Sequence, residues 1–342
     1  MITEDLHFPP DFYQQIKHNK LRRADWHDYY SKCFYLLTFM KNNHPEVPVF
    51  SSLFEKGNSI GVDFCWSGWA IYNSIKKFER QYPFFKMWRY VIMPDHLHLI
   101  MYATQRLDQH LGQYVRLFKT ICTEQFHSKS KVRAETTASV FEAGFNDRIL
   151  YQEGQLDRWT NYIEENPRRL WLMRHNPEFF RRYSLVRADC PLHILDDNAN
   201  PDLEIRVPHE FPIFGNSCLL NYPEKIVVRF SSKFSHEEWE KKQKAVLQTA
   251  KNGGILVSPF IHQEEKRLMK EGINLGARII KIIPDGYAER TKPSGNDFYH
   301  CAEGRMLFLA LNPIGNDMKA TAVTRPLCER MNRCAKWICG EK

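Results

Sequence analysis

Two histidines separated by one residue carry the strongest chemical signal in the sequence. They lie in residues 93–99, MPDHLHL. Side chains two residues apart on a β-strand lie on the same side, so His96 and His98 would present both imidazoles together while Leu97 and Leu99 point into the core. Two imidazoles on one face suit a divalent metal ion whose remaining ligands come from elsewhere. The alternative is a pair of histidines on the solvent-exposed face of a half-buried strand.

A tyrosine and an asparagine form the second signal, in residues 162–169, YIEENPRR. Tyr162 and Asn166 are one helical turn apart and would share a face of the helix. The phenol and the side-chain amide could therefore contact the same ligand. Pro167 is expected to end this helix, because proline lacks the N–H that continues the hydrogen-bond ladder. The same pattern also arises without any function, since Asn is common near helix ends.

The first half of the chain must fold into the elements that position these side chains. Periodicity predicts strands over 33–40, 88–93 and 96–102, the last two around a tight turn at Pro94-Asp95. Amphipathic helices are predicted over 66–80, 107–126 and 155–166. This order indicates an α+β sandwich with its helices on one face of the sheet.

The second half differs in texture, because continuous apolar strands alternate with amphipathic helices. The strands are expected over 226–231, 254–260, 277–283 and 306–310, and the helices over 235–251 and 262–276. Such alternation is typical of a parallel, Rossmann-like α/β sheet. Residues 188–208 are acidic and contain prolines, which indicates a linker. The expected domains are therefore 1–187 and 209–342.

The composition limits the kinds of binding partner and the cellular compartment that we expect for this protein. Lys and Arg number 48 against 40 Asp and Glu, and the formal charge of +8 is compatible with a polyanionic partner. No apolar run reaches the ~20 residues that span a bilayer, and residues 1–10 lack a basic start followed by an apolar core. The nine cysteines never form a Cys-x-x-Cys pair, so we expect reduced thiols in the cytoplasm, no zinc knuckle and no membrane partner.

Taken together, the two motifs resemble a known family. Residues 90–102, YVIMPDHLHLIMY, resemble the HUH strand of the REP-associated tyrosine transposases, a branch of the single-tyrosine transposases. Residues 145–150, FNDRIL, followed by YIEENPRR, are similar to the closing part of that family in order and spacing. The resemblance covers roughly residues 25–175 and implies a ferredoxin-like α+β HUH domain.

The resemblance also implies roles for the site residues. His96, His98 and Asn166 would hold a divalent metal ion, Mg²⁺ or Mn²⁺, and Tyr162 would be the nucleophile. Attack on a phosphate would give a 5′-phosphotyrosine and a free 3′-hydroxyl, so that strand transfer needs no ATP. The implied partner is single-stranded, hairpin-forming DNA, and the resemblance admits a homodimer. Two other phenols compete for the role of nucleophile, Tyr90 and Tyr151.

Basic residues near these motifs are candidates for contacts with DNA. Arg168 and Arg169 follow Asn166, and Arg116 and Lys119 are three residues apart on the preceding helix. Arginine and lysine side chains can track phosphates along a strand. A solvated helical face would show the same residues.

The second half is similar to the Rossmann-like domain of the DNA-processing protein A family and its lysine-decarboxylase-like relatives. The similarity lies in residues 254–261, GILVSPFI, and then in order in 284–286, 292–295 and 301–305. In such domains, turns like those at Ser258 and Ser294 sit where phosphates or nucleic acid bind. Either serine could instead simply shape its turn. No G-x-G-x-x-G or Walker sequence is present, so we expect a DNA-binding or partner-docking appendage without a nucleotide cofactor.

Three functions are thus open for the chain. The leading one is an active single-strand transposase, and the second is a host-adopted DNA-binding protein that keeps the fold without moving DNA. The third is a metal-dependent phosphodiesterase in which water attacks the phosphate. That hydrolase would need a carboxylate near the metal, for which Asp95 and Asp147 are the nearby candidates.

Overall fold

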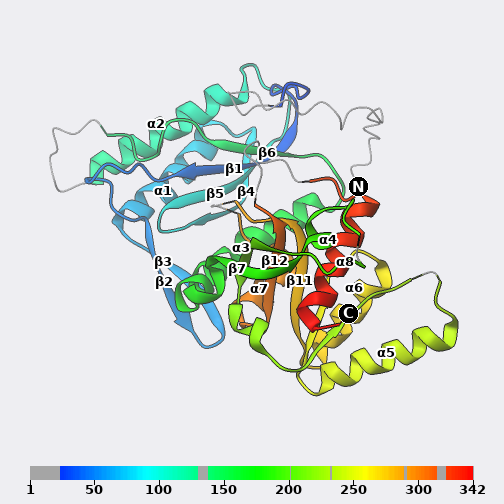
Figure 1. Ribbon diagram of the computed structural model, residues 1–342. Helices are drawn as coiled ribbons and strands as arrows, with labels where there is room; N and C mark the ends of the chain where they lie inside the picture. The colour runs from blue at the N-terminus through cyan, green and yellow to red at the C-terminus, as the bar shows by residue number, and fades with distance from the viewer. Residues whose placement is uncertain are drawn as a thin grey trace. The chain divides into compact units, whose positions relative to one another are not determined.

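The computed structural model describes residues 24–129, 138–200, 202–231, 233–288, 291–313 and 321–341 (Figure 1). Residues 1–10, for which no signal segment is expected, lie outside this part. The chain divides into two compact units, Met1–Trp171 and Leu172–Lys342. Each is a mixed α/β unit with its own sheet.

The first unit is built on a four-stranded antiparallel sheet. Its strands are β4 (Phe85–Ile92), β5 (His96–Ala103), β1 (Cys33–Met40) and β6 (Asn146–Leu150), in that spatial order. The register places Thr38 opposite His98 on one neighbour and opposite Asn146 on the other. A separate hairpin, which the periodicity does not predict, is formed by β2 (Ser51–Lys56) and β3 (Ser59–Phe64).

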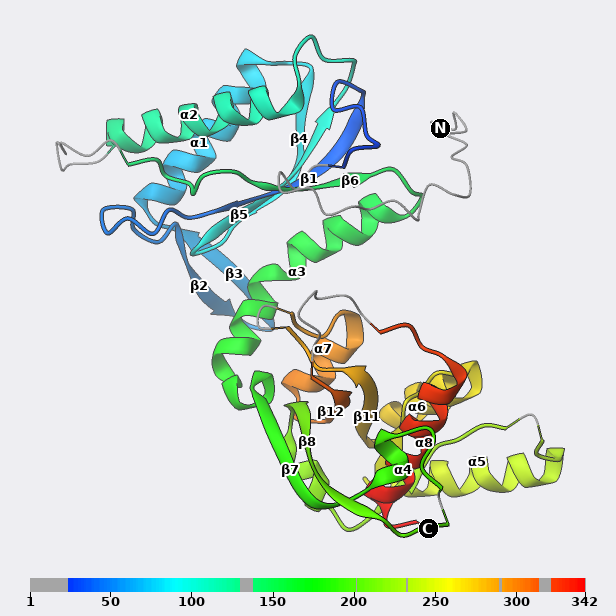
Figure 2. The same ribbon diagram turned by 45° about the horizontal axis from the view of Figure 1, so that its top comes forward.

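Helices cover both faces of this sheet, and not one face as expected. Figure 2 shows α1 (Trp66–Gln81) and α2 (Leu111–Lys129) together on one side and α3 (Gln155–His175) crossing the other. Leu99 packs into the core on the α1 and α2 side, whereas Leu36 and Ile100 pack with Ile163 of α3. Because successive strand residues are apolar on both faces, each face needs a cover.

The third helix continues through Pro167 to His175, so the expectation that proline ends it is wrong. Pro167 cannot donate a hydrogen bond to the carbonyl of Ile163. Both side chains are buried, and the packing of this face offsets part of the cost of the lost bond. Arg168 and Arg169 consequently lie inside a helix and not after one.

The second unit contains a six-stranded sheet in the order β7-β8-β12-β11-β10-β9. The strands β9 (Lys225–Val227), β10 (Ile255–Ser258), β11 (Arg278–Asp285) and β12 (Met306–Asn312) are parallel. An antiparallel pair, β7 (Arg182–Pro191) and β8 (Arg206–Gly215), joins at β12. The parallel part agrees with the apolar strands in the sequence.

Two layers of helices enclose this second sheet. The helices α5 (His236–Lys251), α6 (Gln263–Asn274) and α7 (Gly295–Ala302) pack on one face. The short α4 (Leu192–Leu195) and α8 (Arg325–Cys339) pack on the other. The described part of the unit also contains the 3₁₀ helices η2 (Pro177–Phe180) and η3 (Ser217–Asn221).

The expected linker at 188–208 instead belongs to the second unit. It contains the end of β7, all of α4 and the start of β8, and the expected boundary at Arg187 falls within β7. These acidic, proline-containing residues form the connection between the paired strands β7 and β8. The connection is largely exposed, and for this reason its composition is as polar as that of a linker.

Among the described residues, the structure contains no helix that is long and apolar enough to cross a membrane. All nine cysteines are free thiols.

Candidate active site

His96 and His98 lie side by side on the face of the sheet that α3 crosses. Their ring centroids are 4.6 Å apart. His98 is buried, with 8% of its surface exposed, and His96 is partly exposed. Leu97 and Leu99 are fully buried on the opposite face. The predicted alternation of imidazoles and leucines is confirmed.

Each imidazole has a hydrogen-bond partner at its Nδ1 atom. Oγ1 of Thr38 lies 2.8 Å from Nδ1 of His98, and Oδ1 of Asp95 lies 2.7 Å from Nδ1 of His96. A histidine whose Nδ1–H donates to an oxygen keeps the Nε2 lone pair for a metal ion. The contacts at Nδ1 are thus compatible with Nε2 of each ring binding a metal ion.

The burial of His98 has an electrostatic consequence. Removal of the ring from water, together with the neighbouring His96, lowers the pKa of His98 from 6.5 to about 3. His98 is therefore neutral near pH 7, and neutral imidazole is the form that binds metals.

The third helix brings the phenol of Tyr162 to this histidine pair. The ring centroids of Tyr162 and His98 are 5.5 Å apart. Tyr162 is half-buried, and its hydroxyl has no hydrogen-bond partner among the described residues. Asn166, one turn further, is buried and donates from Nδ2 to the Tyr162 carbonyl (2.9 Å), which leaves its Oδ1 oxygen for another partner.

The two competing phenols lie elsewhere. Tyr90 packs against the core on the α1 and α2 side, 6.4 Å from the ring of Tyr72. Tyr151 packs on the same side, 5.4 Å from the ring of Trp26. Of these three tyrosines, Tyr162 is thus the one that contacts the histidine pair.

Three further residues support the site and have no predicted role in the sequence. Trp159 packs edge-on against Tyr162, with centroids 5.2 Å apart, and Arg148 of β6 lies 4.5 Å from the Trp159 ring centre. Thr38 is the third, through His98. The sequence does show that Thr38 is a polar residue in the otherwise apolar strand CFYLLTFM. It does not show that His98 is the partner of Thr38, because that pairing depends on the long-range register of β1 and β5.

The donor set is compatible with a divalent metal ion. In the described part of the molecule, no group of three or more His, Cys, Asp and Glu side chains could hold one. Two imidazoles lie together on the sheet face, and Asn166 carries an amide oxygen one helical turn beyond Tyr162. Nitrogen and oxygen donors of this kind suit Mn²⁺ and other first-row ions, and water or phosphate oxygens can complete the coordination.

The two acids that a hydrolase could use are placed differently. Asp147 faces the α1 and α2 side of the sheet, where its Oδ2 accepts a hydrogen bond from Tyr29 (2.7 Å). Asp95 is exposed and engaged with His96. Asp147 therefore faces away from the histidine pair, whereas Asp95 lies beside one of its imidazoles.

The four predicted DNA-contacting residues fall into two places. Arg168 and Arg169 follow Asn166 on α3, and Arg168 lies 3.9 Å from Glu165. Arg116 and Lys119 lie on α2, which packs on the face opposite to the histidines. Arg168 and Arg169 therefore lie on the same helix as Tyr162, whereas Arg116 and Lys119 lie on the other side of the sheet.

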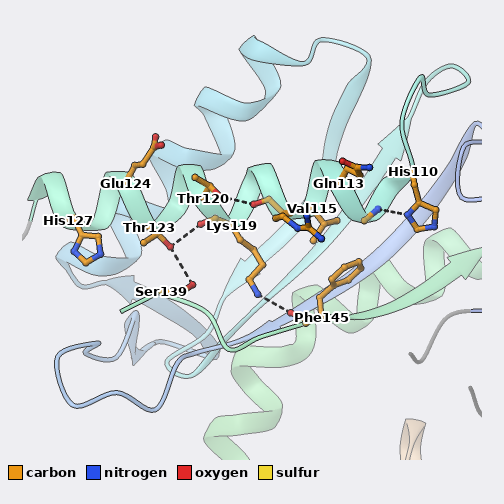
Figure 3. A pocket seen from close by; sticks show the side chains of 13 residues that line it. His110, Gln113, Val115, Lys119, Thr120, Thr123, Glu124, His127, Ser139 and Phe145 are labelled. Atoms are coloured by element: carbon orange, nitrogen blue, oxygen red, sulfur yellow. Dashed lines mark hydrogen bonds between the residues drawn. The ribbon is translucent and has the colours of Figure 1, made fainter. Parts of the chain in front are cut away.

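Arg116 and Lys119 line a groove of about 750 Å³ between α2 and residues 139–145 (Figure 3). Lys119 is half-buried and donates to the carbonyls of Glu142 and Gly144, the latter at 3.1 Å. Its pKa is lowered by burial. Arg116 is exposed in the same groove. Lys119 thus anchors a loop, while Arg116 is accessible to a ligand.

Of the two turns expected to bind phosphate in the second unit, the one at Ser258 is satisfied internally. Ser258 is fully buried, and its Oγ accepts from the N–H of Phe260 (3.0 Å). The buried carboxylate of Glu265 accepts from the N–H groups of Phe230, Ile261 and His262, at 3.0, 3.0 and 3.3 Å. Ser294 precedes α7 without a side-chain cap. Ser258 therefore shapes its turn.

No family model and no curated protein match this sequence. A solved REP-associated tyrosine transposase bound to a REP hairpin is 15% identical, with a TM-score of 0.31 over 43% of this chain, or 74% of that protein. A protein from Deinococcus radiodurans assigned as a transposase is 14% identical, with a TM-score of 0.26 over 42% and 95%. DNA processing protein A from Helicobacter pylori, described with single-stranded DNA, is 15% identical, with a TM-score of 0.29 over 46% and 66%.

Proposed function

We propose that the protein cleaves and rejoins single-stranded DNA through a covalent 5′-phosphotyrosine at Tyr162. The observation that carries this proposal is the placement of the Tyr162 ring 5.5 Å from His98, on the face where both histidines lie. The sequence motifs around these residues, which resemble those of REP-associated tyrosine transposases, support the same reading. The first unit is then the ferredoxin-like HUH domain of that family.

The reaction is a transesterification in which Tyr162 exchanges one phosphodiester for another. Its oxygen forms a bond to phosphorus, the bond from phosphorus to the 3′ oxygen breaks, and the phenol proton is balanced by the proton gained by the 3′-hydroxyl. A phenol has a pKa near 10, so it needs electrophilic help at the phosphate. The ester energy is conserved, and a second 3′-hydroxyl can reverse the step on another strand.

His96, His98 and Asn166 would hold a Mg²⁺ or Mn²⁺ ion. When bound, the ion supplies charge that polarises the scissile phosphate and neutralises the developing negative charge. Thr38 and Asp95 would fix the two imidazoles in the tautomer that leaves Nε2 unprotonated. Trp159 packs edge-on against Tyr162 and would restrict rotation of its ring. Arg168 and Arg169 would bind DNA phosphates further along α3.

For the second unit, we propose a Rossmann-like domain that serves as an appendage for DNA or a partner protein. Its four consecutive parallel strands with helices on both faces support the fold assignment. A hairpin-forming single strand is the proposed substrate, and a homodimer is compatible with the proposal.

The direct test is a cleavage assay on end-labelled hairpin DNA with Mn²⁺, analysed on denaturing gels. Wild type should form a protein–DNA adduct that Tyr162→Phe lacks. Tyr151→Phe is the matched control, because Tyr151 lies on the other side of the sheet, and should form the adduct at the wild-type rate. Cleavage that survives Tyr162→Phe would establish a water-attacking phosphodiesterase. Binding without cleavage on every substrate would favour the host-adopted DNA-binding protein.

A further inference from the structure

Three aromatic side chains gather on the same sheet face as the histidine pair, further along β5. Side chains on this face recur at every second residue, from His96 and His98 to Tyr102. Phe34 pairs directly with Tyr102 across the strands, and the two rings stack with centroids 4.0 Å apart and planes 9° apart. Trp88 meets Phe34 edge-on at 5.7 Å.

The backbone turns Trp88 outward. The pairing of β4 with β5 shifts between Met87 and Arg89, so Trp88 occupies a β-bulge. Bulges re-aim a side chain at the cost of regular pairing. Trp88 is 53% exposed, although exposure of so large an apolar surface is unfavourable in water. Phe34, which Trp88 contacts, and Tyr102 are both half-buried.

Two basic side chains of β4, Lys86 and Arg89, lie on the same face of the sheet as these rings. Lys86 pairs with Tyr102 in the register, and its neighbours Phe85 and Met87 are buried on the other face, so Lys86 lies on the aromatic side. Lys86 is exposed. Arg89, two residues beyond Met87, reaches α3 and lies 3.2 Å from Glu164. Flat rings beside positive charge match the chemistry of an unpaired nucleotide, which presents a π-face and a phosphate.

We propose that Phe34, Trp88 and Tyr102 form a stacking platform for unpaired bases of the strand whose phosphate Tyr162 attacks. This inference rests on single-stranded DNA as the substrate of the proposed function. Tyr102 lies four residues from His98, about 13 Å along the strand. The platform therefore holds nucleotides next to the cleaved phosphate and selects single strands, because bases in a duplex already stack on one another.

The test measures DNA binding separately from chemistry, with the full-length protein carrying Tyr162→Phe in EDTA and fluorescein-labelled oligothymidylate. Trp88→Ala should raise Kd about 5- to 100-fold, the loss expected for one base–aromatic stack. Trp88→Phe should restore most of the affinity. Trp69→Ala is the matched control, because Trp69 is 52% exposed on α1, and should bind as the parent does. A duplex of equal length should bind with the same affinity to all variants.

An abasic residue moved along the oligonucleotide provides the second readout. The parent should lose affinity at one or two adjacent positions, and Trp88→Ala should lose nothing further there. Unchanged affinity in Trp88→Ala, or an equal loss in Trp69→Ala, would overturn the platform. If the platform variants behave as expected while no phosphotyrosine forms, the platform stands and the proposed chemistry fails.

Discussion

Thr38 and His98 sit directly opposite one another on β1 and β5, and the hydroxyl of one lies 2.8 Å from Nδ1 of the other. The contact joins the single hydroxyl-bearing aliphatic residue of an apolar strand to the buried imidazole of the site. In a metal site, such a contact sets which ring nitrogen is free for the ion.

The first prediction therefore concerns Thr38→Val, which keeps the shape of the side chain but removes its hydroxyl. Mn²⁺ affinity, measured by calorimetric titration, should fall about 10- to 100-fold, as for loss of other outer partners of metal-binding histidines. Thr104→Val serves as the control, because among the described residues the Thr104 hydroxyl bonds only to the Phe84 carbonyl, at 2.9 Å. Equal affinity in Thr38→Val and wild type would remove Thr38 from the site.

The second prediction separates structural from chemical roles of asparagine on α3 and just beyond it. Asn166 and Asn176 each donate from the side chain to the carbonyl four residues earlier, Tyr162 and Leu172. Alanine at either position should cost about 1 kcal/mol in free energy of unfolding. Asn166→Ala alone should also slow adduct formation by about 10- to 100-fold or more. Single-turnover kinetics test this, and equal rates in the two variants would contradict a metal-binding role for Asn166.

The third prediction concerns the proline inside α3. Pro167→Ala restores a donor to the Ile163 carbonyl, and a helix-interior proline costs about 3 kcal/mol. Lost burial of about two methylenes offsets roughly 1.6 kcal/mol of that gain. The variant should therefore be more stable by about 1 kcal/mol in urea unfolding followed by circular dichroism. Pro177→Ala, at the start of η2, should not gain stability, since proline is tolerated there. A destabilised Pro167→Ala would show that packing of the ring outweighs the missing bond.

The fourth prediction distinguishes two residues that the sequence presents as equivalent. Lys119→Met should lower the free energy of unfolding by about 1–3 kcal/mol, because it removes the donor that holds the Glu142 and Gly144 carbonyls. Arg116→Ala should stay within about 0.5 kcal/mol of wild type. If the groove binds DNA, only Arg116→Ala should reduce the salt dependence of binding, by about one unit of slope. Equal stability of the two variants would refute the anchoring role of Lys119.

Local pattern predicts much of the site but not its supports. Alternation alone places His96 and His98 on one face and Leu97 on the other, because the two-residue period is a property of any strand. The contact of Tyr162 with His98 needs a long-range arrangement that no local pattern contains, and only the family resemblance anticipates it. Thr38 and Trp159 escape detection for the same reason.

Errors in the expected fold have physical causes as well. A proline on a buried helix face is tolerated when packing offsets part of its cost, and for this reason Pro167 does not end the helix as expected. The residues around Arg187 are only partly buried, and this edge strand lacks the continuous apolar run that marks β10 or β12. An exposed antiparallel strand followed by a polar turn is therefore difficult to distinguish from a linker.

Glu265 holds three backbone amides at the end of the parallel sheet, where many proteins of this architecture hold a phosphate. The protein thus supplies the acceptor for these three amides from its own chain. Removing that one carboxylate, as in Glu265→Ala, would leave the three backbone N–H groups without their acceptor. A single substitution would therefore turn a fully satisfied turn into one with three unpaired backbone donors.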